Sequence, residues 1–483
     1  MSGGGAYDVI VVGGGGAGLA AAIEARAAGA RVLLLEKNEK LGGSTAWSVG
    51  SITSSDTPHQ RRAGVTDTPE EHWRDMAGFN GALDNRDNPA LRRVLADAMP
   101  DTFRWLLAHG IRFYGPMPEP PHSKPRMHNV LPNSRSFITH LARAARRAGV
   151  VIETQSRAAA LLSEGGRVTG VDCDTPQGRR RYAARAVVLA AGDFTSDPEL
   201  KAQHMGAREA KIDGVNVTAT GDGQKLALAL GARVLNGDLA LGPELRFVPP
   251  QNPNLLLELP PWPLLAEVMA WSLNRLPPAV LRPFVMSFVT TALAPSPALF
   301  EAGALLVNKR GERFTDEKAS PAYDLPDQPD KAGYILLDAR LAAHFTGWPN
   351  FISTAPGVAY AYLDDYRRNR RDIYTGAATL EELARKLGMA ADALARTGHA
   401  LGEGPYVALG PVRAVFVHAE GGLAVDHEHR VLGKEDRPID GLYAAGSTGQ
   451  GGLLLKGHGH HLAWAFVSGR RAGRNAAAAP TSA

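Results

Sequence analysis

The N-terminal part of the chain alternates short apolar runs with glycines, as α/β folds do. Residues 7–12, YDVIVV, form a β-branched run that predicts a buried strand. Residues 19–30, LAAAIEARAAGA, are rich in alanine and predict a helix that ends at Gly29. Residues 31–36, RVLLLE, predict a second strand. Strand, helix and strand in this order favour an α/β fold with a parallel sheet.

Later stretches extend the same pattern. Residues 185–192, RAVVLAAG, predict another buried strand that leaves through a glycine, and residues 220–223, TGDG, open a predicted helix. Residues 441–446, GLYAAG, predict a strand that returns to the first sheet. A final helix is expected from the apolar segment 461–473, HLAWAFVSGRRAG. Helical excursions are expected between Ser51 and Arg135.

An unusually apolar segment runs from residue 254 to residue 306 and is interrupted by prolines and charged residues. No unbroken run in it approaches the roughly 20 apolar residues needed to cross a bilayer. Two interpretations stay open. The segment is either a pair of short helices packed on the body of the protein, or an apolar lid or peripheral membrane contact through which a lipophilic substrate enters.

The composition limits the classes of protein to which the chain can belong. With 483 residues and 44% hydrophobic content, the chain can bury a large core, and its length favours two or more domains. The 53 basic and 49 acidic residues nearly balance and form no basic run, so nucleic acid is not an expected partner. The single Cys173 excludes an internal disulfide and a cysteine-rich metal site. Because the N-terminus lacks a basic leader, we expect a cytoplasmic enzyme.

The glycine turn after the first strand has the pattern GxGxxG. Its glycines allow a pyrophosphate to approach the backbone, and the following helix offers free N–H groups and the positive end of its dipole. Glu36, at the end of the second strand, is placed to accept ribose hydroxyls and disfavours a 2′-phosphorylated nucleotide. We therefore predict a dinucleotide site that includes Gly13, Gly15, Gly16, Ala17, Gly18 and Glu36.

A loop of small residues follows the second strand and is too polar for the core. Residues 41–51, LGGSTAWSVGS, are suited to lie along a diphosphate and a flavin. Glycines and an acid at the later strand and helix ends complete the predicted site. The further cofactor contacts predicted here are Lys37, Gly42, Gly43, Ser44, Thr45, Ser48, Gly50, Gly192, Asp222 and Gly446.

Taken in order, the motifs VGGGGAGLAAA, LLEK, GGSTAWSVG, VVLAAGDF, ATGDGQKLALALGA, GALLVNKRGERFTDE, HAEGGLAVD and GLYAAG span almost the whole chain. This order resembles the flavoprotein subunit family of fumarate reductase and succinate dehydrogenase, which includes ketosteroid dehydrogenases. The resemblance implies FAD and an α/β fold in which a Rossmann-like FAD-binding domain, residues 1–242 and 404–479, is interrupted by an inserted α+β substrate-capping domain, residues 243–403. The apolar segment 254–306 would form its lid.

Respiratory members of this family attach FAD through a histidine in the loop after the second strand. The loop GGSTAWSVGS has no histidine, so we predict noncovalent FAD. The chain also lacks a CxxCH haem motif and a cysteine cluster for iron–sulfur sites. Electrons must therefore come from, or leave to, a separate donor or acceptor.

For a soluble fumarate reductase, the resemblance implies an arginine proton donor after ERFTDE and a second arginine that clamps carboxylates. The first position falls on or near Pro321 and the second near Lys456, which offers a point charge without a bidentate fork. His418 matches the histidine of the HxxGG motif and is placed to bind a substrate oxygen. A four-carbon dicarboxylate is therefore a poor match.

The ketosteroid dehydrogenase branch instead places a tyrosine base near Tyr323. A tyrosine works as a base only where its pKa is lowered, and the predicted source of positive charge is Lys456, His458, His460 and His461. Gly459 matches a glycine N–H that binds the ketone oxygen in that branch. Because Leu455 stands where a tyrosine is expected, Lys456 or His458 would polarise that oxygen. Tyr114 is predicted to assist Tyr323 or to line the pocket, near His122 and His128.

The three histidines within residues 458–461, HGHH, could suggest a metal site. Adjacent residues point in different directions, HExxH is absent, and we expect no acid nearby to serve as a ligand, so no metal is expected. One or two of these histidines are expected at the flavin edge, with His460 and His461 counted among the cofactor contacts, and the rest packed or hydrated at the start of the last helix.

Three functions remain open. The first is an FAD-dependent desaturase or ene-reductase acting on a carbon–carbon bond beside a carbonyl in a hydrophobic, cyclic or steroid-like substrate. The second is a fumarate-reductase-like enzyme that acts on a small unsaturated carboxylate held by Lys456 and His418. The third is a flavin-binding or electron-transfer subunit without catalysis of its own.

Overall fold

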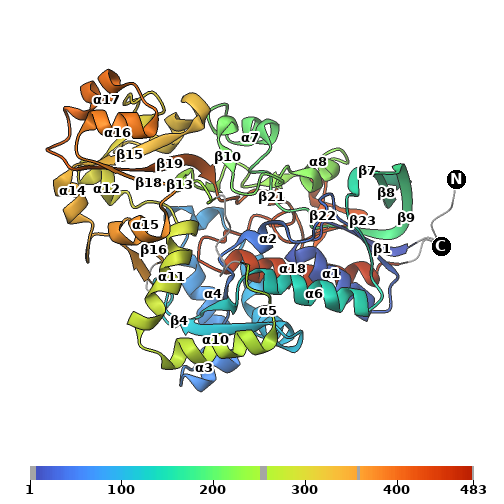
Figure 1. The fold of residues 1–483 in the computed structure, drawn as a ribbon. Coiled ribbons are helices and arrows are strands. Elements are labelled where there is room, and N and C mark those ends of the chain that lie inside the picture. Colours follow the sequence, from blue (N-terminus) through green and yellow to red (C-terminus); the bar gives the residue numbers. More distant parts are fainter. Residues whose placement is uncertain (1–6, 251–257, 356–358, 481–483) are drawn as a thin grey trace.

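The computed structural model describes residues 7–250, 258–355 and 359–480, so residues 254–257 of the predicted lid lie outside the described residues. Figure 1 shows two large sheets at opposite ends of the molecule, with a helical layer beneath them. Both helices and sheets are present, which confirms the α/β expectation.

The first sheet is built around parallel strands. β1 (Tyr7–Val12) lies between β2 (Val32–Leu35) and β9 (Gly178–Leu189), and its residue Ile10 pairs with Leu33 on one side and Val187 on the other. The sheet order is β22–β23–β9–β1–β2–β6. The remaining strands are β6 (Val151–Glu153), β7 (Arg157–Glu164), β8 (Arg167–Thr175), β22 (Arg430–Leu432) and β23 (Pro438–Ala444). The strands expected from YDVIVV, RVLLLE, RAVVLAAG and GLYAAG all lie in this sheet.

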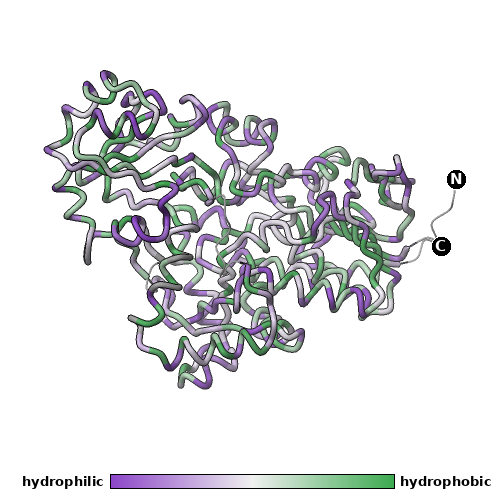
Figure 2. The backbone as a smooth tube through the Cα atoms, in the orientation of Figure 1, coloured by the Kyte–Doolittle hydropathy of each residue, from purple (hydrophilic) through white to green (hydrophobic). Residues whose placement is uncertain are grey.

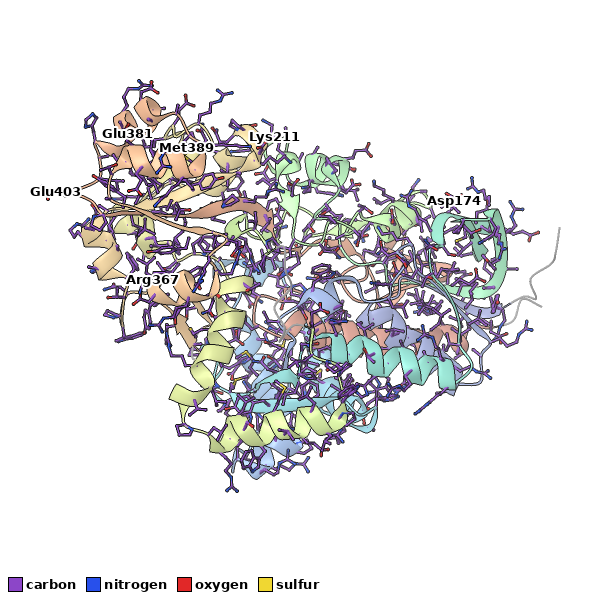
Figure 3. All side chains as sticks on the ribbon, in the orientation of Figure 1. Asp174, Lys211, Arg367, Glu381, Met389 and Glu403 are labelled. Carbon is purple, nitrogen blue, oxygen red and sulfur yellow. The ribbon has the colours of Figure 1, made fainter. Side chains whose placement is uncertain are left out.

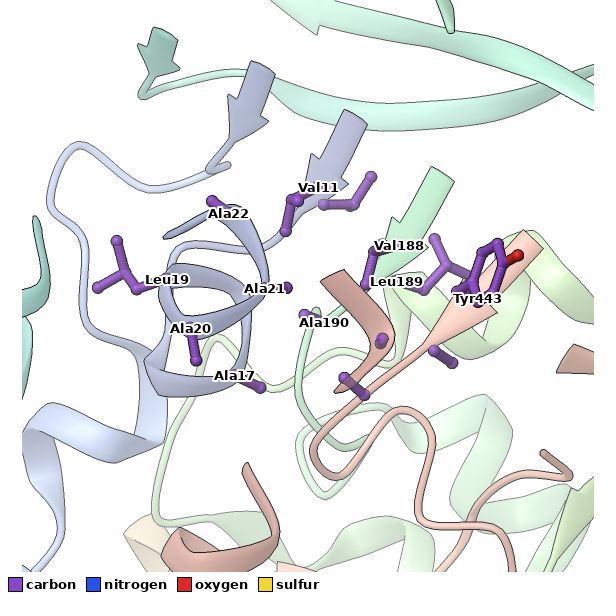
Figure 4. Packing of buried hydrophobic residues seen from close by; sticks show 14 of the residues in the cluster. Val11, Ala17, Leu19, Ala20, Ala21, Ala22, Val188, Leu189, Ala190 and Tyr443 are labelled. Carbon is purple, nitrogen blue, oxygen red and sulfur yellow. The ribbon is translucent and has the colours of Figure 1, made fainter. Parts of the chain in front are cut away.

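Helices α1 (Gly16–Ala27) and α18 (His460–Ala477) cover this sheet and pack side by side, with α6 (Arg135–Arg147) against α1. Small residues let the first two helices approach closely. A Cβ atom on Gly469 would lie 2.3 Å from the carbonyl oxygen of Ala17, and one on Gly473 would lie 2.1 Å from that of Ala21. Figure 4 shows part of the resulting core, in which Ala21 of α1 lies on the side of the helix that faces Val188 and Leu189.

The second sheet has the order β10–β19–β15–β14, with β13 and β18 also paired to β19. Its strands are β10 (Asp213–Gly214), β13 (Glu244–Phe247), β14 (Leu305–Asn308), β15 (Gly333–Leu337), β18 (Tyr374–Ala377) and β19 (Tyr406–Phe416). Its helices are α14 (Ala339–His344), α15 (Leu363–Asn369), α16 (Leu380–Leu387) and α17 (Ala391–Gly398). Strands β10 and β19 join this sheet from outside residues 243–403. The boundaries of the capping domain at 243 and 403 therefore stay predictions.

The predicted excursion between Ser51 and Arg135 holds helices and also a small sheet, which sequence patterning did not reveal. The sheet order is β3–β5–β4. The elements are β3 (Ser51–Thr53), α3 (Pro58–Arg62), α4 (Pro69–Ala77), α5 (Pro89–Ala108), β4 (Arg112–Met117) and β5 (Met127–Leu131).

The described part of the predicted lid forms helices α10 (Pro263–Arg275), α11 (Pro278–Ala292) and α12 (Ala298–Glu301). Short elements complete the chain. They are α2 (Gly43–Trp47), α7 (Pro198–His204), α8 (Asp222–Leu228), β11 (Val234–Leu235), β12 (Ala240–Leu241), α13 (Pro321–Asp324), β16 (Ser353–Ala355), β17 (Ala359–Ala361), β20 (His418–Ala419) and β21 (Gly422–Leu423).

Hydrophobic positions concentrate in the central strands, and hydrophilic ones along the rim of the molecule (Figure 2). Charged side chains such as Asp174, Lys211, Arg367 and Glu381 lie at that rim (Figure 3). Among the described residues, no helix combines the length and the apolar character that crossing a membrane requires.

We expect Gly473→Ala to destabilise the protein, because its new methyl group would meet the backbone of Ala21 at 2.1 Å and force α1 and α18 apart. Overpacking of this kind costs about 1–3 kcal/mol, more than alanine gains over glycine in a helix. The free energy of unfolding measured in urea tests this. Gly347→Ala is the control, since nothing lies within 4 Å of a Cβ there. Equal stabilities of the two variants would contradict the close packing.

Candidate functional site

The glycine turn between β1 and α1 has no room for a side chain at Gly13 or Gly18. Gly13 has a φ of +108°, and a Cβ there would lie 2.3 Å from the oxygen of Ala190. A Cβ on Gly18 would lie 1.8 Å from the oxygen of Gly13. No side chain caps α1 at Gly15, so the positive end of the helix dipole faces the turn. The turn, with Gly16 and Ala17, can therefore cradle a diphosphate.

Glu36 is buried at the end of β2 and held by backbone groups. Its Oε2 accepts a hydrogen bond from Gly14 N at 2.7 Å, and its Oε1 accepts one from Asn38 N at 2.8 Å. A carboxylate has about four acceptor sites, so each oxygen can still accept a ribose hydroxyl. The donor set therefore fits the predicted dinucleotide.

The two remaining charged cofactor candidates are paired with each other. Lys37 Nζ donates to Asp222 Oδ2 at 2.8 Å and to Thr220 Oγ1 at 2.6 Å, while Arg157 donates to Asp222 Oδ1. Burial works to raise the pKa of Asp222, but the bonds from Arg157 and Lys37 lower it overall. The pair ties β2 to the start of α8, and its contact with a cofactor stays a prediction.

The loop of small residues after β2 lies directly against the glycine turn. Gly42 N donates to Gly14 O at 3.0 Å, and Gly16 N donates to Thr45 Oγ1 at 3.1 Å. Ser48 Oγ donates to Thr45 O at 2.9 Å. Three further members of the predicted set complete the loop: Gly43, whose nearest neighbour is Gly15; Ser44, bonded to Asn216; and Gly50, with a φ of +81°.

Two glycines from later strands reach the same place. Gly446 N donates to Ser468 Oγ at 2.8 Å, and a Cβ on Gly446 would lie 2.9 Å from that of Ala17. Gly192 has open space at its Cβ position and accepts from Thr448 Oγ1 at 2.8 Å. Backbone from β1, β9 and β23 therefore converges on the start of α1.

Large apolar side chains are exposed around this convergence. Trp47 in the loop is 77% exposed and Val217 is 74% exposed. Val49, Val215 and Leu241 are also exposed, and the bond from Asn216 to Ser44 brings two of these segments together. Such apolar surface is what a flat aromatic isoalloxazine ring would cover. The residues present therefore fit a flavin as well as a diphosphate.

Beside this surface, His418, Glu420 and His461 form a compact cluster. His418 Nε2 lies 3.4 Å and His461 Nε2 lies 3.6 Å from Glu420 Oε1, and the centroids of the two rings are 3.5 Å apart. Glu420 Oε2 accepts from Gln450 Nε2 and Leu455 N. The buried carboxylate is thus fixed by one oxygen and presents the other to both histidines.

The charges of this cluster follow from its burial. Burial and the neighbouring His418 lower the pKa of His461 to about 4, against the effect of Glu420, so His461 is neutral at pH 7. Burial works to raise the pKa of Glu420, but His418 and His461 hold it well below its usual range. The cluster therefore joins an ionised carboxylate to a neutral imidazole that can accept a proton.

Sequence reasoning missed Glu420. The expectation that no acid lies near the histidines was wrong, because the fold brings Glu420 within 3.6 Å of His461. The available signal was the motif HAEGG, in which Glu420 follows His418 by two positions. Because His461 lies far from Glu420 in the chain, the sequence alone did not show that these two residues meet.

The other members of the basic cluster lie elsewhere. Lys456 is exposed, and His458 is exposed and paired with Glu119, with Nδ1 2.5 Å from Oε1. The hydrogen bond and charge of Glu119 raise the pKa of His458. Gly459 has a φ of +86°, and a Cβ there would lie 2.8 Å from the backbone of Ile52, so this position requires glycine. It begins α18 next to the strand that follows the flavin loop.

His460 points into the protein rather than toward the cluster. It is 1% exposed, and its Nε2 lies 3.2 Å from His122 Nε2, with His72 5.9 Å away between ring centroids. Burial lowers the pKa of both His460 and His122 to about 3. This burial leaves no ring surface of His460 for a ligand, and its role as a cofactor contact stays a prediction.

Two groups in the described residues have the composition of metal sites, His72–His122–His460 and His418–Glu420–His461. In the first, Arg126 donates to His122 Nδ1, so the ring proton of neutral His122 occupies Nε2, where a metal would bind. In the second, two imidazoles on one tetrahedral ion would hold their centroids about 5 Å apart, against the 3.5 Å observed. Neither geometry favours an ion.

The two candidate tyrosines do not meet. Tyr323 lies on α13 with the Arg208 guanidinium 4.6 Å from its ring centroid. Burial and Glu209 raise its pKa, against the effect of Arg208, so the expected lowering by Lys456 and the histidines is not what the structure shows. Tyr114 lines a pocket of about 510 Å³ together with Arg62, Arg112 and residues of α10. His128 is buried in the small sheet.

Known proteins resemble the chain over most of its length. A family model described as an FAD binding domain matches residues 8–255 and 275–454. The NADH:fumarate oxidoreductase of Klebsiella pneumoniae (strain 342) is 25% identical over 92% of the chain, which spans 44% of that protein. A KsdD-like steroid dehydrogenase of Mycobacterium tuberculosis (strain CDC 1551 / Oshkosh) is 26% identical, covering 97% of the chain and 95% of that protein.

Among solved structures, the open conformation of a flavocytochrome c3 fumarate reductase has a TM-score of 0.74 at 24% identity. The match covers 98% of this chain and 78% of that chain. At this identity the likeness shows the fold alone.

The buried histidines predict an acid-sensitive fold. Below pH 6.5 the unfolded chain takes up protons that rings such as His72 refuse in the folded state, because burial and the neighbouring His460 hold its pKa well below 6.5. The free energy of unfolding should therefore fall as pH drops, by about 1.4 kcal/mol per pH unit for each such ring.

We expect His72→Phe to make that fall shallower by about one proton, measured by urea unfolding between pH 7 and about pH 5. The exposed His399 offers a matched control, since His399→Phe should leave the slope unchanged. An unaltered slope in His72→Phe would show that this ring titrates normally in the folded protein.

Proposed function

The chain belongs to the FAD binding domain family, and from that premise we propose that it is an FAD-dependent oxidoreductase that desaturates or reduces a carbon–carbon bond beside a carbonyl group in an apolar substrate. The family match confirms FAD, which the glycine turn, Glu36 and the resemblance predicted. The observation that carries the proposed chemistry is the cluster of His418, Glu420 and His461 beside the exposed apolar surface.

The position of this cluster supports a role beside the flavin. His461 stands two residues after Gly459, whose backbone packs on Ile52 just past the flavin loop. His418 pairs in β20 with the exposed Leu241 of β12. The cluster therefore lies between the loop expected to hold the flavin and the two-stranded sheet of β12 and β20.

The charge of the cluster favours a neutral substrate. A dicarboxylate would place its negative charge near ionised Glu420, and like charges at close range repel strongly in a buried site. The exposed Lys456 is the only residue at the expected clamping position, and it lacks a guanidinium fork. A ketone or enone oxygen, in contrast, can accept a hydrogen bond from an imidazole N–H without this penalty.

Bound FAD supplies the acceptor or donor of a hydride. In desaturation, the neutral imidazole of His461 accepts the proton from the carbon next to the carbonyl, and Glu420 stabilises the imidazolium that forms. His418 holds the carbonyl oxygen. In reduction the same proton returns from His461 to that carbon. The apolar side chains around the loop exclude water from the reacting bond.

A different catalytic base or a different substrate would make other demands on the site. A tyrosine base at Tyr323 would have to overcome a pKa that burial raises. A small unsaturated carboxylate would require Lys456 to turn inward toward His418. A separate electron donor or acceptor is proposed in every case, since the single Cys173 cannot build an iron–sulfur chain. A cytoplasmic location and a lipophilic substrate are part of the same proposal.

We expect Glu420→Gln to lower turnover of a cyclic enone or ketosteroid by about 100-fold or more, because the amide keeps the bonds to Gln450 and Leu455 but cannot stabilise an imidazolium. Stopped-flow reduction or reoxidation of the flavin measures this step. Tyr323→Phe is the matched comparison and should retain most activity. Loss of activity in Tyr323→Phe with full activity in Glu420→Gln would assign the base to Tyr323 instead.

The same assay separates the substrate classes. Photoreduced wild-type enzyme should be reoxidised by enones and not by fumarate. Strong reoxidation by fumarate, abolished by Lys456→Ala, would favour the small carboxylate. If no compound of either class reoxidises the flavin, the result would favour a flavin-binding or electron-transfer subunit.

Noncovalent FAD predicts that the purified protein is yellow and that acid precipitation releases all of its flavin into the supernatant. The visible flavin absorbance of the two fractions measures the partition. Flavin that stays with the precipitated protein would contradict noncovalent binding. The flavin loop has no histidine through which such attachment could occur.

A further inference from the structure

One helix stands outside the part of the chain that the family shares. The family match stops at residue 255 and resumes at residue 275, and α10 occupies the gap from Pro263 to Arg275. Figure 1 shows α10 along an outer edge of the molecule, beside α3 and below α11. Almost all of this helix therefore lies outside the residues that the family model matches.

The outward face of α10 is apolar. Leu264 is 73% exposed, Val268 is 52% exposed and Trp271 is 59% exposed, and their spacing of four and three residues places them on one face of the helix. Trp262, just before the helix, is 65% exposed. We call these residues the α10 stripe. In a protein surrounded only by water, such a contiguous apolar stripe is unfavourable.

The opposite face of α10 holds it in place. Ala266 is 2% exposed and packs toward β4. Beside the stripe, the exposed Glu267 has its Oε1 3.6 Å from Arg112 Nε, and Asn133 Nδ2 donates to Leu259 O just ahead of the helix. The stripe is therefore presented outward by a helix that is anchored along its other side.

The charged side chains next to the stripe are mainly basic. The pocket of about 510 Å³ between α10, α3 and β4 is lined by Arg62 and Arg112, with Trp271 at its edge and Glu267 as its acid. Arg275 is exposed at the end of α10, one turn past Trp271. An apolar stripe that carries tryptophans and is bordered by arginines matches the surface of an anionic bilayer.

Length excludes a spanning arrangement. A helix of 13 residues extends for about 20 Å, which is shorter than the ~30 Å hydrocarbon core. A helix of this length lies in the plane of the interface, with apolar side chains in the acyl region and arginines at the phosphates.

We propose that the α10 stripe is a membrane-surface anchor that docks the protein on anionic lipid, with the pocket of Arg62 and Arg112 receiving a lipid phosphate. This inference goes beyond the proposed function and does not depend on the identity of the substrate. Docking would place the pocket and Tyr114 against the lipid phase.

Cosedimentation with vesicles tests the proposal on the full-length, flavin-loaded protein. Vesicles of phosphatidylcholine with phosphatidylglycerol should carry wild-type protein into the pellet, more so than vesicles of phosphatidylcholine alone, and added salt should weaken the binding. The double variant Leu264→Ser/Trp271→Ser should bind more than about tenfold more weakly, since both lost side chains enter the lipid.

Trp348→Ser is the matched control, because Trp348 is 67% exposed but lies in the chain between β15 and β16, apart from α10. It should bind as the wild type does. Flavin content should be the same in all variants, which separates this result from any failure of the proposed function. Arg62→Gln should weaken binding to the anionic vesicles and leave binding to the neutral ones unchanged.

Three outcomes would overturn the anchor. Wild-type protein that stays in the supernatant with both vesicle types would exclude it, and so would a double variant that sediments like the wild type. A dimer in light scattering that the double variant dissociates, without vesicle binding by either, would show that a second copy of the chain covers the stripe.

Discussion

The candidate site depends on the close packing of α1 against α18. Glycines at 469 and 473 let the backbone of α18 touch the carbonyl groups of Ala17 and Ala21. Both pairs advance in the same direction, so α18 runs parallel to α1 and begins well before it. His461 precedes Gly469 by eight residues, which places it about 12 Å along the axis beyond the start of α1. One contact therefore sets the spacing between the diphosphate end and the substrate end of the site.

At the substrate end, a buried carboxylate organises the polar groups. Glu420 is held on one oxygen by Gln450 and Leu455, and it faces His418 and His461 with the other. Burial keeps His461 neutral, while the two rings and the hydrogen bonds keep Glu420 ionised. The pair can take up a proton without a net charge being buried alone, which is the requirement for acid–base chemistry in an apolar site. The same negative charge selects against anionic substrates.

Exposed apolar side chains gather in two places, and the two differ in physical meaning. Trp47 at the end of α2, Val217 and their neighbours lie within the family match, where a cofactor ring would cover them. The α10 stripe lies in the unmatched segment and faces outward. The first group is explained by a ligand within the fold, whereas the second requires something outside the protein. The exposed fraction of the side chains alone would not distinguish these two groups.

The sequence by itself determined the first sheet, its glycine turn and a dinucleotide site, because these rest on local spacing: YDVIVV, GxGxxG and Glu36 follow one another within 30 residues. FAD was implied by the resemblance of motifs along the whole chain to a known family. The sequence also identified the apolar segment that contains α10. Only the tertiary structure decided which histidine meets which acid. Neighbouring His460 and His461 point to different sides of α18, one toward His122 and one toward Glu420. Side-chain direction on a helix changes by about 100° per residue, and contacts between residues more than 300 positions apart depend on packing that no local pattern encodes.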